Sequence, residues 1–140
     1  MNNFKLVVVM VFGTFDILHP GHLNFFKQAK KLGNFLLIVV ARDRYVKKAK
    51  SKYPMNNEKL RIKNVRKIKK TDKVILGSST HNFYQTIRTH NAKIIALGYD
   101  QKPRIFELKR NLRRHRLGYI KVVRLRAFKP NLYKTSLLVK

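Results

Sequence analysis

The chain has 140 residues, and its 33 lysines and arginines against 6 aspartates and glutamates give a formal net charge of +27 at pH 7. Its hydrophobic fraction of 44% can fill a packed core, which argues against a disordered chain, and the absence of cysteine excludes disulfides and thiolate metal sites. No apolar stretch approaches the ~20 residues of a membrane-spanning helix, so we expect a single domain over residues 1–140, with no signal peptide, no membrane contact and a cytoplasmic location.

Short apolar runs rich in Val, Ile and Leu alternate with amphipathic segments along the chain. The first kind predicts buried strands, and the second kind, with apolar residues at helical spacing, predicts helices. Residues 42–57 are polar and basic and carry no predicted helix or strand. The expected elements, in chain order, are a strand over 5–11, a helix over 22–32, a strand over 35–41, a helix over 58–68, a strand over 73–76, a helix over 82–90, a strand over 94–97, a helix over 103–117, a strand over 119–125 and a short helix within 132–140.

The repeated alternation of strand and helix predicts an α/β fold with one parallel sheet and helices on both of its faces. Right-handed crossovers then give a single doubly wound, Rossmann-like sheet. In such sheets ligands bind beyond the carboxyl ends of the strands, where the strand order reverses. The polar loops that follow the first, second and fourth strands, residues 13–22, 42–48 and 98–101, belong to this edge. We therefore expect the functional site there.

The positive charge is spread along the chain, with clusters at residues 47–50, 67–70 and 113–116. Such a charge attracts anions, including nucleotides, phosphorylated small molecules and RNA. Aromatic residues do not alternate with the basic clusters, as a surface for stacking nucleic-acid bases would require. We therefore favour a solvated basic surface, or a general bias towards Lys and Arg, over a dedicated nucleic-acid interface.

The most informative motif follows the first strand, where residues 13–22 read Gly-Thr-Phe-Asp-Ile-Leu-His-Pro-Gly-His. His19 and His22 are three residues apart, so they share a face at the start of a helix. Unpaired N–H groups and the helix dipole favour an anion at this position. Two imidazoles there would stabilise a phosphoryl-transfer transition state, either by charge or as N–H donors. The motif predicts phosphate chemistry; the structural alternative is a pair of histidines that caps the helix.

The other residues of the motif support an anion site. Gly13 lets the backbone turn off the strand without a Cβ clash. Thr14 and Phe15 then present backbone N–H groups and a hydroxyl to a phosphate. Pro20 presets a helical φ, and Gly21 permits close approach of the backbone. Together they predict a loop that holds the phosphates of a nucleoside triphosphate.

Three charged residues are further candidates, and each has a structural alternative. Asp16 is predicted to bind substrate or to cap the turn. Lys47 is predicted to neutralise an incoming phosphate as a point charge, or to be a solvated lysine. Asp100 is predicted to accept hydrogen bonds from a ribose or to hold a metal-bound water, with a turn-forming aspartate as the alternative.

A second anion site is predicted near the end of the chain. Lys134 precedes Thr135 and Ser136, and either hydroxyl suits the N-cap of a helix. A cationic side chain beside free helix-start N–H groups would hold the β- and γ-phosphates opposite the two histidines. Without the first motif, this run would predict only a helix cap.

The sequence His19-Pro20-Gly21-His22, preceded by Gly-Thr-Phe-Asp, resembles the HxGH motif of the cytidylyltransferase-like nucleotidyltransferase superfamily. Within it the chain is most similar to the archaeal FAD synthases, which are FMN adenylyltransferases. Three further runs carry this resemblance: Val-Ala-Arg-Asp at 40–43, Ala-Leu-Gly-Tyr-Asp-Gln at 96–101 and Tyr-Lys-Thr-Ser at 133–136. Between residues 54 and 61 the chain has fewer acidic residues than the family, and only Glu58 and Arg61 keep its pattern. The last motif is shorter than the Arg-Thr-x-Gly-x-Ser-Thr form of the cytidylyltransferases.

The resemblance implies an HxGH-type nucleotidyltransferase fold, ATP and FMN as substrates, a divalent metal such as Mg²⁺, and compatibility with a homodimer. It implies that both histidines act on the ATP phosphates and that Lys134, Thr135 and Ser136 form the second phosphate-binding motif. The catalytic assignment of Lys47, in preference to the neighbouring Lys48, depends only on its place after the second strand. The residues that it implies in ATP binding are Thr14, Phe15, His19, Pro20, Gly21, His22, Asp100, Tyr133, Thr135 and Ser136.

The sequence thus predicts transfer of AMP from ATP to FMN, with the FMN phosphate attacking the α-phosphorus and pyrophosphate leaving. Two alternatives stay open. One is a cytidylyltransferase that uses CTP with glycerol 3-phosphate or a similar phosphorylated alcohol. The other is a basic nucleic-acid-binding protein that keeps the same fold, for which binding would depend steeply on salt concentration.

Overall fold

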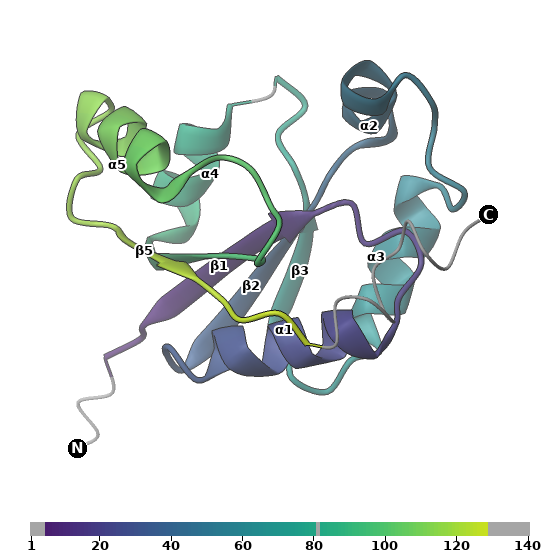
Figure 1. The fold of residues 1–140 in the computed structure, drawn as a ribbon, viewed down its shortest axis with the longest axis horizontal. Helices are drawn as coiled ribbons and strands as arrows, with labels where there is room; N and C mark the ends of the chain where they lie inside the picture. Colours follow the sequence, from purple (N-terminus) through teal and green to yellow (C-terminus); the bar gives the residue numbers. More distant parts are fainter. Residues whose placement is uncertain (1–4, 81, 129–140) are drawn as a thin grey trace.

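The computed structural model describes residues 5–80 and 82–128 (Figure 1). Within these residues the five strands form one parallel sheet in the order β3-β2-β1-β4-β5, which confirms the predicted doubly wound α/β fold. The elements are β1 (Val8–Gly13), α1 (Pro20–Lys30), β2 (Phe35–Val40), α2 (Asp43–Lys50), α3 (Glu58–Arg66), β3 (Lys73–Leu76), α4 (Phe83–His90), β4 (Ala92–Leu97), α5 (Ile105–Arg114) and β5 (Lys121–Arg124).

Strand β1 is at the centre of the sheet, between β2 and β4. Gly13 at its carboxyl end pairs with Val40 of β2, and Met10 pairs with Ile95 of β4. The chain first builds outward from β1 to β2 and β3, and then returns to the other side of β1 to form β4 and β5. The strand order therefore reverses between β1 and β4, and the loops at the carboxyl ends of these strands border the expected ligand site.

Two hydrophobic layers cover the two faces of the sheet, because alternate residues of a strand point to opposite faces. Val9 faces the layer that contains Phe26 of α1 and Val65 of α3, whereas Met10 faces the layer that contains Ile87 of α4 and Leu112 of α5. All six side chains are at most 1% exposed. In Figure 1, α1 and α3 accordingly lie on one side of the sheet, and α4 and α5 on the other.

Most predicted elements are confirmed, with shifts at their ends. Strand β1 occupies residues 8–13 rather than 5–11, and the helix predicted from Pro103 begins at Ile105, after the N-cap Arg104. The expectation for residues 42–57 was wrong for Asp43–Lys50, which form α2. The helix predicted within 132–140 lies outside the described residues, and the single domain over residues 1–140 stays a prediction. Within the described ranges, every helix is too short or too polar to span a bilayer.

Candidate active site

The loop between β1 and α1 is shaped by the ring of Phe15. This residue adopts a left-handed backbone with φ of 52°, and its side chain is 6% exposed, packed edge-on against Phe26. The expectation that Gly13 avoids a Cβ clash where the chain leaves the strand is confirmed, because a Cβ on Gly13 would lie 2.9 Å from Cζ of Phe15. Gly13 itself does not have a positive φ, so its backbone conformation does not require glycine. Glycine ends the strand here because the aromatic ring occupies the space of a side chain.

The two histidines of the motif lie together at the start of α1. Their ring centroids are 4.0 Å apart with the planes tilted by 38°, as their three-residue spacing predicts. His19 is the N-cap, and its Nδ1 accepts a hydrogen bond of 3.1 Å from the N–H of Gly21. Pro20 occupies the first turn, which contains no acidic side chain. The positive end of the α1 dipole therefore stays uncompensated by any first-turn carboxylate and favours a bound anion.

Burial decides the charge of this pair. It lowers the pKa of His22 to about 4, with a further decrease from the neighbouring charge of His19, and it also lowers the pKa of His19. Both rings are therefore neutral at pH 7. Because Nδ1 of His19 accepts a hydrogen bond, the proton of its neutral ring is on Nε2. Of the two possibilities that the sequence left open, the structure favours N–H donors over cations.

His22 contributes an orphaned polar atom to the site. Its ring packs edge-on against Phe15, with centroids 5.8 Å apart. Its Nδ1 is buried and has no hydrogen-bond partner among the described residues. A buried polar atom without a partner costs about 1–3 kcal/mol, and folded proteins retain few of them. The orphaned atom is therefore consistent with a side chain kept for function.

The loop after β4 borders the other side of the position where the strand order reverses. The amide of Gln101 donates a hydrogen bond of 2.6 Å to the carbonyl of Phe12 on β1, and its oxygen accepts from the N–H of Gly98. Arg124 of β5 donates to the carbonyls of Gly98, Gln101 and Pro103. These contacts fix the position of the exposed Asp100 within the loop, at the sheet edge where its contact with ATP is predicted.

Arg61 is a structural residue of the site whose role the sequence did not reveal. Its side chain is 0% exposed although the chain is strongly basic. Its guanidinium donates to the carbonyl of Thr14 at 2.8 Å, to the carbonyl of Asn56 at 3.0 Å and to the carboxylate of Asp43 at 2.6 Å. Asp43 also exchanges hydrogen bonds with Glu58, the first residue of α3. One side chain thus connects the β1–α1 loop, α2 and the start of α3.

Asp16 makes a second connection between the same two loops. Its carboxylate oxygens accept hydrogen bonds from the backbone N–H groups of Met55 and Asn56, at 2.6 and 2.8 Å. The side-chain amide of Asn56 donates back to the carbonyl of Asp16. Asp16 therefore positions the motif against residues 55–56, and its predicted contact with substrate stays a prediction.

The structure does not bring Lys47 into contact with the histidine pair. Its ammonium group donates to the carbonyl of Ser51 at the end of α2 and lies 5.5 Å from the ring centroid of Tyr53. Its predicted catalytic role stays a prediction. The second predicted anion site, with Tyr133, Lys134, Thr135 and Ser136, lies outside the described residues.

A resident divalent metal finds no ligand set in the described part of the chain, where no three His, Cys, Asp or Glu residues cluster. Asp16 and Asp43 near the motif already accept hydrogen bonds from backbone N–H groups or from Arg61. Mg²⁺ is often held by substrate phosphates with few protein ligands. The expected Mg²⁺ therefore stays a prediction, and no step below is assigned to a metal held by these residues.

Comparisons with known proteins agree with this geometry. The model of the family described as cytidylyltransferase-like matches residues 10–139. A curated protein named FAD synthase from Aciduliprofundum boonei is 42% identical over 123 residues, which are 88% of this chain and 80% of that protein. Another FAD synthase, from Thermococcus sibiricus, is 35% identical over 140 residues, 99% of this chain and 94% of that one.

Among solved structures, one described as a lipopolysaccharide core biosynthesis protein from Thermoplasma volcanium superimposes with a TM-score of 0.83 and 35% identity. The alignment covers 89% of this chain and 100% of that one. The arrangement of the sheet and its crossovers is therefore shared with an experimentally determined structure.

Proposed function

The chain belongs to the cytidylyltransferase-like family, and on that basis we propose that it is an FAD synthase, which transfers the AMP unit of ATP to FMN. Its relatives of that name cover most of the chain, and the chain covers most of each relative. The observation that carries the proposal is the pair of adjacent, neutral imidazoles at the start of α1, beside the point where the strand order reverses.

The reaction needs no covalent intermediate on the enzyme. An oxygen of the FMN phosphate attacks the α-phosphorus of ATP, and the bond between this phosphorus and the oxygen that bridges to the β-phosphate breaks. FAD and pyrophosphate are the products. Because the attacking oxygen is already anionic, the protein chiefly positions the two substrates and stabilises the negative charge of the transition state.

We assign that stabilisation to His19 and His22. A neutral imidazole can donate its N–H to a phosphate oxygen without desolvating a buried cation. The positive end of the α1 dipole adds to this field. In this proposal, Thr14 and Phe15 contribute backbone N–H groups to the triphosphate, Gly21 permits its close approach to the backbone, and Asp100 contacts the nucleotide from the opposite loop.

The second predicted motif would complete the site from the end of the chain. We propose that Lys134, Thr135 and Ser136 hold the departing pyrophosphate and that Tyr133 contacts the nucleotide. A bound Mg²⁺ would shield the negative charge of the leaving group. A homodimer in solution and a cytoplasmic location are also part of the proposal, to be tested by light scattering and by cell fractionation.

A screen of nucleotides against acceptors tests this function. Radiolabelled ATP and CTP are each incubated with FMN, glycerol 3-phosphate and phosphopantetheine in the presence of Mg²⁺. We expect FAD and pyrophosphate from ATP and FMN, and no change in that rate when RNA is added. The assignment fails if this pair yields no FAD while another pair reacts.

A further inference from the structure

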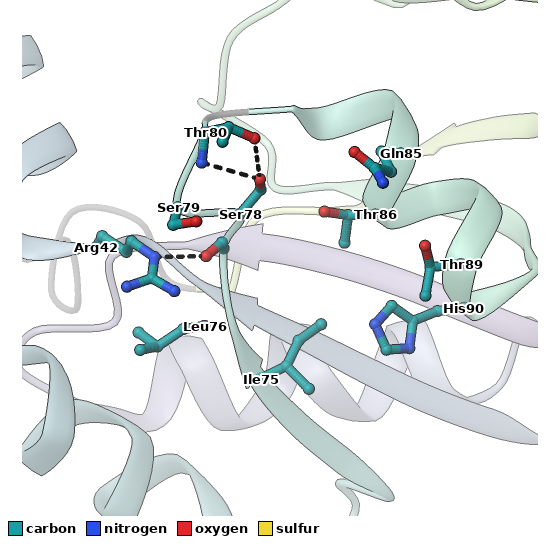
Figure 2. A pocket seen from close by; sticks show the side chains of 11 residues that line it. Arg42, Ile75, Leu76, Ser78, Ser79, Thr80, Gln85, Thr86, Thr89 and His90 are labelled. Carbon is teal, nitrogen blue, oxygen red and sulfur yellow. Dashed lines mark hydrogen bonds between the residues drawn. The ribbon is translucent and has the colours of Figure 1, made fainter.

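A cavity of about 400 Å³ opens beside the end of β3, away from the histidine pair (Figure 2). Its walls are the loop after β3, one face of α4 and the side chain of Arg42, which follows β2. In Figure 2, Arg42 and His90 are at opposite ends of the labelled group; Thr86, Thr89 and His90 of α4 lie on the same side of β3 as Ile75, whereas the side chain of Leu76 lies on the other side, below Arg42. The volume is within the range of small-molecule sites, about 300–1,000 Å³.

Helix α4 divides its residues between the core and the cavity. Phe83 and Ile87 pack into the hydrophobic layer under the helix. Thr86, Thr89 and His90 line the cavity instead, at the three- and four-residue spacing that places side chains on one helix face. The polar stripe of this short helix is therefore turned towards an open hollow beside the sheet.

The rim of the cavity is held in place by neighbouring elements. The hydroxyl groups of Ser78 and Thr80 share a hydrogen bond of 2.9 Å, and the N–H of Thr80 also donates to Ser78. The carbonyl of Ser79 accepts hydrogen bonds from the side chains of Arg44 and Tyr45 on α2. Helix α2, which sequence patterns did not predict, thus fixes the loop that forms the cavity wall.

The lining combines an apolar floor with hydrogen-bonding walls. Ile75 provides the apolar floor on the side of α4, and hydroxyl, amide and imidazole groups surround it. Burial, with a further contribution from the charge of Lys73, lowers the pKa of His90, so this ring is neutral at pH 7 and can donate and accept hydrogen bonds. Among residues 5–80 and 82–128, no acidic side chain lines the cavity. Such a lining suits a flat ring system with polar edges that is joined to a phosphate.

The cavity also lies two strands away from the end of β1, where the loop that carries the histidines begins. Leu76 at the end of β3 pairs with Val40, which pairs with Gly13 at the end of β1. Neighbouring strands are about 4.8 Å apart, so two spacings place the cavity floor about 10 Å from the end of β1. A ring in the cavity could therefore carry a phosphate, on a short flexible chain, to the edge where the histidines stand.

Arg42 follows β2, the strand that lies between β3 at the cavity and β1 before the histidines. Its Nε donates a hydrogen bond of 2.7 Å to the carbonyl of Gly77, and its Nη1 is 4.0 Å from the carboxylate of Glu58. A guanidinium has five N–H donors in a rigid fork, so it can hold these contacts and still donate to a phosphate. Its side chain is 30% exposed and therefore accessible to a ligand.

Resting on the proposed function, we propose that this cavity is the acceptor subsite, which binds the ring system of FMN and directs its phosphate past Arg42 towards His19 and His22. The ATP phosphates would occupy the start of α1, and the flavin would approach from the β3 side. Two substrates would then meet above the ends of β1 and β2 without competing for one pocket.

Filling the cavity tests the proposal. Thr89→Trp and, as a second variant, Gln85→Trp place an indole in the space assigned to the flavin ring, and Lys59→Trp on the exposed surface of α3 is the matched control. We measure the KM values for FMN and ATP from FAD formation, and the Kd of FMN alone from its fluorescence. Thermal melting identifies which variants keep the wild-type fold.

We expect Thr89→Trp to raise the KM and Kd of FMN by about tenfold or more, while the KM of ATP and the control change by less than about twofold. An FMN Kd that is unchanged in both folded cavity variants, or equal increases for FMN and ATP, would overturn the subsite. If the wild-type protein makes no FAD, the proposed function fails, whereas the FMN titration still decides the cavity: FMN binding that the indole removes supports it, and no binding overturns it.

Discussion

The guanidinium of Arg61 donates a hydrogen bond of 2.8 Å to the carbonyl of Thr14, although 47 positions separate the two residues in the chain. The same side chain, fully buried, holds Asp43 and Asn56. The β1–α1 loop, which carries the motif, is therefore held in position by a side chain from α3. This helix comes after β2 and α2 in the sequence. The planar guanidinium donates in fixed directions and reaches all three acceptors at once, which explains why arginine occupies this position.

Replacing Arg61 with Lys is expected to destabilise the protein, because an ammonium group on a flexible stem cannot reach the three acceptors together. Removing one partner of a buried ion pair altogether costs about 3–5 kcal/mol, and we expect Arg61→Lys to cost less than this, because lysine keeps the positive charge and Asp43 keeps some exposure to solvent. Urea unfolding measures the change. The exposed Lys63→Ala on the same helix is the control, with an expected effect within about 0.5 kcal/mol. If Arg61→Lys unfolds at the same urea concentration as the wild type, the hydrogen bonds of Arg61 do not hold the loop.

His19 has two separable roles, a helix cap and a proposed donor to phosphate. Asn at this position still accepts the capping hydrogen bond but lacks the Nε2–H, so His19→Asn should keep wild-type stability. Its kcat should fall by about 10²–10³, the usual loss for one preorganised donor. His19→Ala should show the same fall in kcat and lose a further ~1 kcal/mol of stability. If His19→Asn keeps full activity, His19 does not donate to the phosphate and acts only as the helix cap.

The stability of the ligand-free protein should depend on the titration of His22. Its folded-state pKa of about 4 is below the ordinary value of 6.5, so protons bind the unfolded chain more readily. The contribution of His22 is complete above pH 6.5 and is lost as the pH falls towards 4. At about 1.4 kcal/mol per pKa unit, it is at most about 3 kcal/mol.

Chemical unfolding at several pH values checks this, with His22→Phe as the comparison because a phenyl ring keeps the aromatic contact with Phe15 and does not titrate. As the pH falls from 6.5 to 4, the unfolding free energy of the wild type should decrease relative to that of this variant. Above pH 6.5 the difference between the two should be constant. A difference that is the same at every pH would contradict the lowered pKa.

The strands and the motif could be predicted from local patterns because each is a property of neighbouring residues. Apolar runs located every strand of the sheet, and the pattern of Gly, His and Pro after β1 located the start of α1. Helix α2 has only Val46 buried, so it presents no apolar stripe from which to predict it. Its place depends on contacts with Ser79 and Arg61, which lie far along the chain.

The same distinction applies within the site. The pairing of His19 and His22 follows from three-residue spacing, whereas the contacts of Asp16 with Met55 and Asn56 join loops about 40 residues apart. Arg61 is one of 33 basic residues, and its resemblance to the family pattern together with Glu58 was the one signal in its favour. Burial of an arginine is a tertiary property, which composition and periodicity do not carry.

The last prediction concerns the space above Gly13. In Gly13→Ala the new methyl group would lie 2.9 Å from Cζ and 3.2 Å from Cε1 of Phe15, closer than carbon atoms tolerate. The ring is packed between Phe26 and His22, so its displacement disturbs both contacts. We expect a loss of about 1–3 kcal/mol in unfolding free energy, as for other overpacked cores, together with a fall in kcat because His22 moves with the ring. Gly77→Ala is the matched control, since its Cβ would meet nothing closer than 3.7 Å. Equal stability of the two variants, measured by urea unfolding, would show that the Phe15 ring can yield, and that steric exclusion does not account for glycine at the end of β1.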